Sequence, residues 1–306
     1  AIMEVGYKNG AQFHFNSPVE NIIIENNLVT GIMVNGNKID FDAVIASADY
    51  HHVESKLLSS GQRNYQNGYW EKKTFTPSCL IFYVGLTKRI KNLQHHTLFF
   101  EEDLLQHSKE IYKDPKWPTR PLFYVCCPSQ TDDGVAPEGH ENLFLLMPVA
   151  PGLEDKQEVR EKYFNIMVER LQKQIGENIT EYIDFKQSYC VKDFIADYNS
   201  YKGNAYGLAN TLMQTAILKP SMRNKKVRNL FYAGQLTVPG PGVPLRWHFD
   251  VTQSSGCVDR IAGRGGGECG SIDQRWDLVW GKECACGYLV PAWRSSACGG
   301  ECKLAA

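Results

Sequence analysis

The sequence lacks a long hydrophobic run and an excess of charge of either sign. Its longest apolar stretches, 79–86 and 143–150, are far shorter than the roughly 20 residues that cross a bilayer as a helix. Lys and Arg together number 33 and Asp and Glu 34, so the formal net charge is -1. This balance gives no electrostatic basis for nucleic-acid binding. The N-terminal residues are amphipathic and lack the features of a signal peptide.

A glycine-rich strand–turn–helix of the G-x-G-x-x-G type, which cradles a dinucleotide pyrophosphate, is also missing. The close glycines of the segment 263–267 follow no predicted strand, so they do not supply this fingerprint.

What is present suits a globular protein. The 306 residues can form one large domain or two smaller ones, and the hydrophobic content of 43% is ordinary. Cysteine is unevenly distributed. Four residues resemble buried intracellular thiols: Cys79, Cys126, Cys127 and Cys190. Six lie after residue 244: Cys257, Cys269, Cys284, Cys286, Cys298 and Cys302.

The first part of the chain has the pattern of a β-hairpin unit. Alternating apolar residues predict strands over 12–15, 19–24, 28–34 and 38–45. Asn35-Gly36 between two of them is a strong hairpin signal. Asp49 is a good N-cap for a predicted helix over 50–58. His51 and His52 are adjacent and share no helix face, so we expect surface or capping histidines there.

A second group of elements follows a polar crossover at 59–77. We predict strands at 78–86, 97–100, 122–126 and 142–148, and helices at 102–112 and 157–174. In the longer helix, apolar residues at i, i+3 and i+4 spacing define one buried face. The aromatic, glycine-rich segment 190–215 is predicted to be a loop. The whole pattern is that of a mixed α/β (α+β) chain.

The segment 229–244 carries the most specific signal. Leu230–Ala233 is a short apolar strand that ends at Gly234, and a stiff proline- and glycine-rich turn follows. A strand, a bare turn and a helix N-terminus together form a ready anion site, since free N–H groups and the helix dipole point the same way. A proline–glycine loop without a ligand is the alternative on spacing alone.

This segment resembles the C-terminal flavin motif of the carotenoid desaturases of the phytoene desaturase type, which are amine-oxidase-like flavoproteins. Four other segments fit the same family in the right order: Asn16–Glu20, Ala46–Asp49 with the two histidines after it, His95–Phe100 and Asp197–Leu208. The resemblance implies FAD-dependent desaturation of a C40 polyene precursor such as phytoene, giving more unsaturated polyenes such as lycopene.

The resemblance also implies a domain organisation. Residues 1–75 would be part of an FAD/NAD(P)-binding Rossmann-like domain, on the adenine side. Residues 76–215 would form a substrate-binding domain with a mixed sheet and helices, and 216–244 the C-terminal FAD-binding segment. We expect 245–306 to be an aberrant, disordered tail rich in Gly, Cys and Trp.

Site residues follow from the motif matches. The family pattern assigns cofactor contacts to Val19, Gly234, Gly240, Gly242, Val243 and Pro244. It places Tyr201, Tyr206 and Gly207 near the substrate passage. FAD would accept the hydride, because no side chain can. No carboxylate is singled out by spacing as a catalytic acid or base, and no metal site is expected.

The expected substrate, a phytoene-like polyene, is stored in the bilayer. The resemblance therefore implies a protein that docks on a membrane surface, in the cytoplasm on the inner face of the cell membrane. Candidate apolar contacts are Leu98, Phe99, Phe100 and the Trp117-Pro118 loop. The oligomeric state is left open.

The family opens with the pyrophosphate-binding element that is missing here, so we expect a fragment that binds FAD poorly. After Pro244 the pattern departs from the family, and we expect a frameshift near residue 245. A zinc module is the rival interpretation, but Cys284-x-Cys286 is a single close pair, with no second C-x-x-C and no histidine after His248. A genuine extension is the third possibility.

Other functions stay open on the motifs. A carotenoid isomerase, saturase or ketolase of the same family would share them. A non-catalytic metal-binding protein built on the cysteine-rich tail, or an inert pseudo-enzyme fragment, are readings from other classes.

Overall fold

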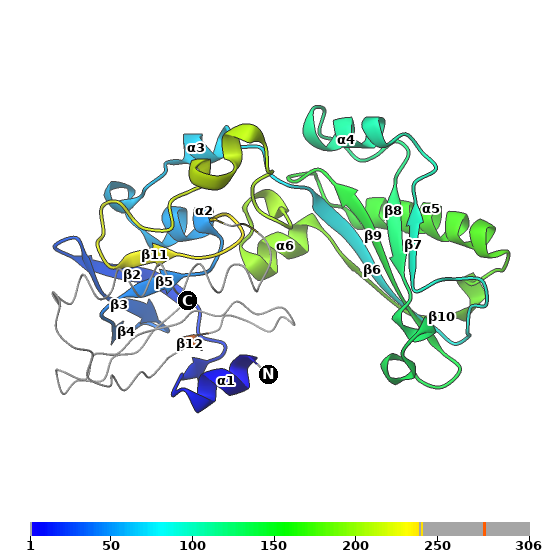
Figure 1. The fold of residues 1–306 in the computed structure, drawn as a ribbon, viewed down its shortest axis with the longest axis horizontal. Coiled ribbons are helices and arrows are strands. Elements are labelled where there is room, and N and C mark those ends of the chain that lie inside the picture. The colour runs from blue at the N-terminus through cyan, green and yellow to red at the C-terminus, as the bar shows by residue number, and fades with distance from the viewer. Residues whose placement is uncertain (1, 239, 241–277, 280–306) are drawn as a thin grey trace. The chain divides into compact units, whose positions relative to one another are not determined.

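The structure, a computed structural model, describes residues 2–238, 240 and 278–279. They form two compact units (Figure 1). Of the described residues, the first unit contains those up to 73, 197–201 and those from 207 onward, and the second contains 74–196 and 202–206. Residues 207–215, expected in the substrate domain, thus belong to the first unit.

The first unit begins with helix α1 (Ile2–Lys8) and a three-stranded antiparallel sheet in the order β2-β3-β4. The strands are β2 (Val19–Glu25), β3 (Leu28–Val34) and β4 (Asn37–Asp40). Asn35 and Gly36 both have positive φ, 49° and 72°, which is the backbone of a two-residue type I′ hairpin. The predicted hairpin is confirmed.

One predicted strand, 38–45, is wrong because it is two strands in two sheets. β4 ends at Asp40, and β5 (Val44–Ala46) pairs in parallel with β11 (Leu230–Tyr232). Between them the Phe41 side chain is buried, and Val44 N donates to Asn229 O at 3.0 Å. The chain therefore leaves the hairpin sheet within three residues.

Asn229 joins these two sheets. Its side chain is buried, donates to Val29 O at 2.9 Å and accepts from Val29 N at 2.7 Å. It also donates to Asp42 O at 2.6 Å. A buried amide satisfied in this way sets the position of β11 beside the hairpin, since any shift would leave buried polar groups unpaired.

The predicted helix 50–58 is a helical turn, α2 (Tyr50–His52), that continues as a π-helical turn, η1 (Val53–Leu57). Tyr50 stacks on Tyr232 with ring centroids 3.9 Å apart. Further elements of this unit are β1 (Phe13–His14), paired in parallel with β12 (Leu278–Val279), and η2 (Ser60–Gln62), α3 (Asn67–Glu71), η7 (Leu212–Gln214) and η8 (Ala216–Leu218).

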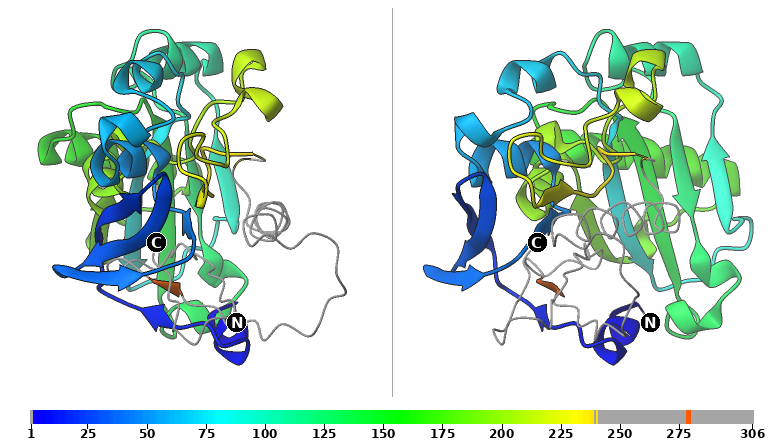
Figure 2. Two further views of the ribbon diagram at one scale, coloured as in Figure 1. Left: turned by 90° about the vertical axis from the view of Figure 1, so that its left-hand side faces the viewer. Right: turned by 60° about the vertical axis from the view of Figure 1, so that its left-hand side comes forward.

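The second unit is built on a five-stranded antiparallel sheet in the order β10-β6-β9-β8-β7. Its strands are β6 (Ser78–Leu86), β7 (His96–Phe99), β8 (Phe123–Cys126), β9 (Glu141–Val149) and β10 (Ile183–Tyr189). Helix α5 (Gln157–Ile175) covers one face of it (Figures 1 and 2). Alternate residues of the strands and the apolar face of α5 form a single core, as the two periodicities predict.

The other face of this sheet is also apolar, and α5 does not cover it. Successive strand residues point to opposite faces, so residues between the core positions lie on this second face. They include Tyr83, Leu98, Tyr124, Phe144 and Leu146, which are half-buried or exposed. Phe144 contacts both tyrosine rings, at centroid distances of 5.5 and 6.3 Å. We call these five residues the open sheet face.

Two elements of the second unit were not predicted. β10 pairs with β6, and α6 (Val191–Tyr198), whose last two residues lie in the first unit, occupies a segment predicted to be a loop. β10 is polar along most of its length, as an edge strand can be. The remaining elements are α4 (Leu104–Tyr112), η3 (Pro128–Gln130), η4 (Asp133–Val135), η5 (Thr180–Tyr182) and η6 (Tyr201–Gly203), whose last two residues lie in this unit.

Candidate functional site

The first unit has a pocket at the carboxyl ends of its two parallel strands. In open α/β sheets, ligands bind at such ends. The pocket is lined by the residues that follow β5 and β11, together with two residues from the segment 197–201. They are Ser47, Ala48, Asp49, Tyr50, Tyr198, Ser200, Ala233, Gly234, Gln235 and Leu236. We call it the strand-end pocket.

Gly234 shapes one wall of this pocket. Its φ of 129° lies in a region that residues with a Cβ rarely adopt. Its carbonyl accepts from Thr237 N at 3.0 Å and from Thr237 Oγ1 at 2.8 Å. The chain therefore turns sharply after β11 and brings bare backbone to the pocket.

The end of the neighbouring strand β5 carries an unsatisfied polar atom. Ser47 is buried, and its hydroxyl has no hydrogen-bond partner among the residues that the structure describes. Leaving a buried hydroxyl unpaired costs about 1–3 kcal/mol. An orphaned hydroxyl beside a glycine turn fits a ligand with hydrogen-bonding atoms, so these residues fit a bound nucleotide cofactor.

Asp49 is the ionisable group of the pocket. Its carboxylate accepts from His52 N at 3.1 Å, as the N-cap of α2, and from Tyr201 N at 3.2 Å. Burial raises the pKa of Asp49 to about 6, against the opposing effect of these backbone donors. His51 packs on the Tyr201 ring at 4.2 Å, and burial, with the charge of His52, lowers its pKa to about 4. At neutral pH the site thus holds a neutral imidazole beside the tyrosine.

At two further glycines, Gly207 and Gly240, neighbouring atoms leave no room for a side chain. A Cβ on Gly207 would be 2.8 Å from Gln235 O in the pocket wall, and its φ is 82°. A Cβ on Gly240 would be 2.7 Å from Nζ of Lys219, whose side chain is buried. Gly240 thus lies against a buried lysine, and a lysine ammonium group can bind an anionic ligand.

The structure brings some of the predicted site residues together and separates others. Gly234 lines the strand-end pocket, and Gly207 packs against the pocket residue Gln235. The Tyr201 N–H donates a hydrogen bond to Asp49. Val19 starts β2 opposite Val34 and does not line that pocket.

Tyr206 belongs to the second unit, where its N donates to Thr76 Oγ1 at 3.1 Å. Gly242, Val243 and Pro244 lie outside the described residues, as does the tail except Leu278–Val279. The sequence analysis did not identify Ser47 as a pocket residue, although its position directly after a buried strand could have indicated it.

The second unit has a groove of about 290 Å³ between the open sheet face and α4. Its lining is almost entirely apolar: Pro77, Leu98, Phe100, Leu104, His107, Ser108, Ile111, Tyr112, Leu122, Phe123, Tyr124, Leu146 and Pro148. We call it the apolar groove. A groove of this composition fits a hydrocarbon ligand and offers few hydrogen bonds to a polar one.

His107 is the only histidine among the groove's lining residues, and its hydrogen bonds fix its tautomer. Leu122 N donates to Nδ1 at 3.1 Å, so Nε2 carries the proton and donates to Pro148 O at 2.9 Å. Burial lowers the pKa of His107 below its usual value. A neutral imidazole with both nitrogens paired joins α4 to the sheet and is not free for proton transfer.

Comparison with known proteins gives the class. The family described as flavin containing amine oxidoreductase matches residues 1–240, and the chain belongs to it. The predicted mixed α/β fold class is confirmed, and so is a flavin cofactor at the level of the family.

The chain is similar to several curated carotenoid desaturases. The chain is 38% identical over 244 residues to a carotenoid 3,4-desaturase of Haloarcula japonica, covering 80% of this chain and 49% of that protein. It is 31% identical over 251 residues to a zeta-carotene-forming phytoene desaturase of Myxococcus xanthus, covering 80% and 47%. The predicted resemblance to carotenoid desaturases is confirmed.

The chain spans about half the length of the curated relatives that it matches. Among solved structures, an oxidoreductase from Methanosarcina mazei is similar at 15% identity with a TM-score of 0.44, covering 80% of this chain and 49% of that one.

Proposed function

We propose that the protein represented by this chain is an FAD-dependent oxidoreductase that desaturates a carotenoid precursor, a phytoene-like C40 polyene. The observation that carries the proposal is the pairing, in one chain of a flavin-containing family, of a strand-end pocket with an open apolar groove. The names of the similar proteins, which are carotenoid desaturases, support the choice of substrate class.

The strand-end pocket is the proposed cofactor side. The Ser47 hydroxyl would donate to the cofactor, and the bare backbone at Gly234 would let it approach closely. FAD, when bound, supplies the hydride acceptor that side chains lack. Asp49 would hold Tyr201 and α2 in place beside it.

The apolar groove is the proposed substrate side. A polyene makes no hydrogen bonds, so its recognition rests on burial of apolar surface, worth about 25 cal/mol per Å². Leu98, Tyr124 and Leu146 would contact the chain, and the groove would exclude water from it. No acid or base is assigned to the proton that leaves with the hydride.

The test is desaturation by the FAD-loaded protein that carries this chain, with phytoene in lipid vesicles. Each added conjugated double bond moves the absorption of the product to longer wavelength. We expect such products from the parent protein and a loss of at least about tenfold in rate for Leu146→Asp, which places a charge in the groove. Val135→Asp, at a 42% exposed position outside the groove, is the matched control.

Product analysis also distinguishes desaturation from the alternative reactions that the motifs leave open. A changed double-bond geometry without new conjugation would identify an isomerase, lost conjugation a saturase, and an added carbonyl a ketolase. Any of these products without newly formed double bonds would overturn the proposed desaturation but keep the polyene substrate. Equal rates for Leu146→Asp and Val135→Asp would exclude the groove as the substrate side.

We further propose that the protein works in the cytoplasm, on the inner face of the cell membrane. Exposed apolar side chains near the groove support this: Leu98 at 61%, Phe100 at 57% and Leu105 at 80% exposure. Among the described residues, no helix is both long and apolar enough to span a membrane.

Vesicle flotation tests the membrane proposal. The parent protein should float with anionic vesicles, and Leu105→Glu should reduce the floating fraction several-fold, whereas Leu212→Glu, in the first unit, should not. If the parent protein stays in the dense fraction, the proposed location is wrong.

A further inference from the structure

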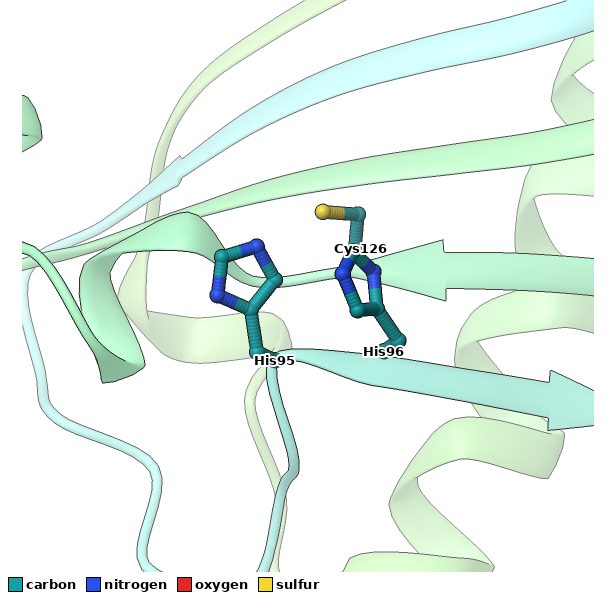
Figure 3. A group of neighbouring side chains, drawn as sticks. All are labelled: His95, His96 and Cys126. Carbon is teal, nitrogen blue, oxygen red and sulfur yellow. The ribbon is translucent and has the colours of Figure 1, made fainter.

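A cluster of metal-binding side chains lies at one end of the second unit's sheet. One ring nitrogen of His95, one of His96 and the Cys126 sulfur lie within 4.8 Å of one another. Figure 3 shows both rings and the sulfur directed toward a common gap. The proposed desaturation assigns no role to these three side chains. We propose that they form a site for a borderline divalent metal ion of the Zn²⁺ type.

The fold explains how the three residues meet. His96 begins β7 and is paired in register with Cys126, which ends β8. Residues directly opposite each other in an antiparallel pair have neighbouring side chains. His95 precedes the strand, and its carbonyl accepts from Cys127 N at 2.8 Å. This hydrogen bond holds His95 directly before β7. From there the His95 ring can lie on the same side as the His96 ring.

The hydrogen bonds of the two rings leave the same kind of atom available on each. His95 Nδ1 is 2.6 Å from Thr131 Oγ1, and His96 Nδ1 is 2.6 Å from Tyr124 Oη. Nε2 is therefore the nitrogen that each ring keeps for an ion. Outer partners of this sort are typical of metal-binding histidines, because they fix the ring orientation and the tautomer.

The threonine is itself positioned to accept. Thr131 Oγ1 donates to Pro128 O at 3.4 Å, and its backbone N donates to the same carbonyl at 3.0 Å. Because the Thr131 hydroxyl donates its proton to Pro128 O, it can accept a hydrogen bond from His95 Nδ1–H. In that tautomer Nε2 is unprotonated. That is the tautomer a metal requires.

The donor set selects the kind of ion. Two imidazoles and a thiolate suit Zn²⁺ and similar ions, and disfavour Mg²⁺ and Ca²⁺, which prefer oxygen ligands. Zinc bonds of about 2.0–2.3 Å put tetrahedral ligands roughly 3.3–3.8 Å apart. The three donors would need to close by about 1 Å, which side-chain rotation can supply because His96 is exposed. A fourth position would be open to water.

The site adjoins the apolar groove. His96 and Leu98 are two residues apart on β7, and Cys126 and Tyr124 are two apart on β8, so His96 and Cys126 lie on the same side of the sheet as the open sheet face. An ion bound here would link the first residue of β7 to the last residue of β8. It would also hold Tyr124, which lines the groove, through the hydrogen bond to His96.

The test uses Co²⁺ as the probe, since thiolate coordination gives it a sulfur-to-metal charge-transfer absorption. The six cysteines after residue 244 could also bind metal, so the parent is the full chain with all six replaced by serine, kept reduced. We expect about one equivalent of Co²⁺ with charge-transfer absorption. Cys126→Ser in this background should abolish the absorption. His96→Ala should weaken binding by at least about tenfold, because even second-shell losses cost 10–100-fold.

Two further variants make the assignment specific. His140→Ala removes a histidine of the same unit that lies outside the cluster, and should bind Co²⁺ like the parent. Tyr124→Phe should keep the charge-transfer absorption but bind about tenfold more weakly. Circular dichroism in the presence of a chelator checks that each variant is folded.

A parent without thiolate charge-transfer absorption, or a folded Cys126→Ser variant that retains it, would overturn the proposal. Equal affinities for His96→Ala and His140→Ala would also overturn it.

Discussion

Asp49 and Tyr201, which are 152 positions apart in the sequence, are joined by a 3.2 Å hydrogen bond from the Tyr201 N–H to the Asp49 carboxylate. The other carboxylate oxygen caps α2. This one side chain therefore sets the position of a helix and of the segment that carries a predicted substrate residue. Its burial has a consequence for stability that can be measured.

The first prediction concerns the pH dependence at Asp49. Its pKa is raised from 3.8 to about 6 in the folded protein. The neutral carboxyl is favoured in the folded state, so its contribution to stability is complete below pH 4 and is lost as the pH rises through 6. Asp49→Asn should reduce the change in the free energy of unfolding across this pH range by about 2 kcal/mol.

Chemical denaturation of the cofactor-free chain at pH 4 to 7 measures this effect. Asp40→Asn, at an exposed carboxylate of the same unit, is the control and should follow the parent protein. If Asp49→Asn and the parent show the same slope with pH, the buried carboxyl does not titrate as described.

The second prediction concerns the buried Tyr232 hydroxyl. It donates to Glu54 at 2.7 Å and accepts from Asn224 Nδ2 at 2.9 Å. Tyr232→Phe would leave a buried amide and a buried carboxylate each short of a partner. We expect a loss of about 1–3 kcal/mol in the free energy of unfolding. Tyr112→Phe, at a 45% exposed ring, should change it little, and equal effects would contradict this role.

The third prediction concerns Gly207. An alanine there would place its Cβ 2.8 Å from Gln235 O on a backbone with φ of 82°. Strain and contact together should cost about 1–3 kcal/mol and displace Gln235 in the strand-end pocket. Gly61→Ala is the matched control, because a Cβ at Gly61 meets nothing within 4 Å.

Thermal denaturation compares these two variants, and flavin fluorescence titration follows the pocket. Gly207→Ala should lower the melting temperature and weaken any FAD binding, whereas Gly61→Ala should leave both near the parent values. A Gly207→Ala protein that melts like the parent would show that the contact is not tight.

The fourth prediction concerns a buried ion pair in the second unit. Arg160 donates to both oxygens of Asp155, at 2.7 and 2.6 Å, and both side chains are buried. Burial opposes ionisation of Asp155, but the hydrogen bonds from Arg160 and Lys192 N outweigh it and lower its pKa. The stabilising effect is therefore present at neutral pH and is lost as the pH falls through the folded-state pKa.

Asp155→Asn leaves the buried Arg160 guanidinium with Asp193, at 2.8 Å, as its remaining carboxylate partner, and should cost about 1–3 kcal/mol. Urea denaturation at pH 7 gives the value, with Asp184→Asn on exposed β10 as control. The difference between the two variants should shrink in acid. A difference that stays constant down to pH 2 would argue against the ionised pair.

Much of the local structure could be predicted from the sequence. Asn35-Gly36 defined a hairpin because both residues tolerate positive φ, and the i, i+3, i+4 spacing of 157–174 defined the buried face of α5. Four of the five strands of the second unit, β6, β7, β8 and β9, were predicted within two residues at their ends. The proline–glycine motif, with the segments that match it, indicated the family.

The polar elements could not be predicted in this way. β10 is largely polar, and it forms because the neighbouring strand β6 offers backbone hydrogen bonds. α6 is short, and Asp193 accepts from Cys190 N at 2.8 Å near its start. Tertiary contacts of this kind override weak local preference.

The sequence by itself determined the hairpin, the apolar strands, the amphipathic helix and the flavin family, because each depends on residues that are neighbours along the chain. Only the tertiary structure decided which distant residues meet: Ser47 with Gly234 through the parallel pairing of β5 and β11, and His96 with Cys126 through the register of β7 and β8. Strand pairing is set by packing and hydrogen bonding across the whole fold, and local periodicity does not determine the register between distant segments.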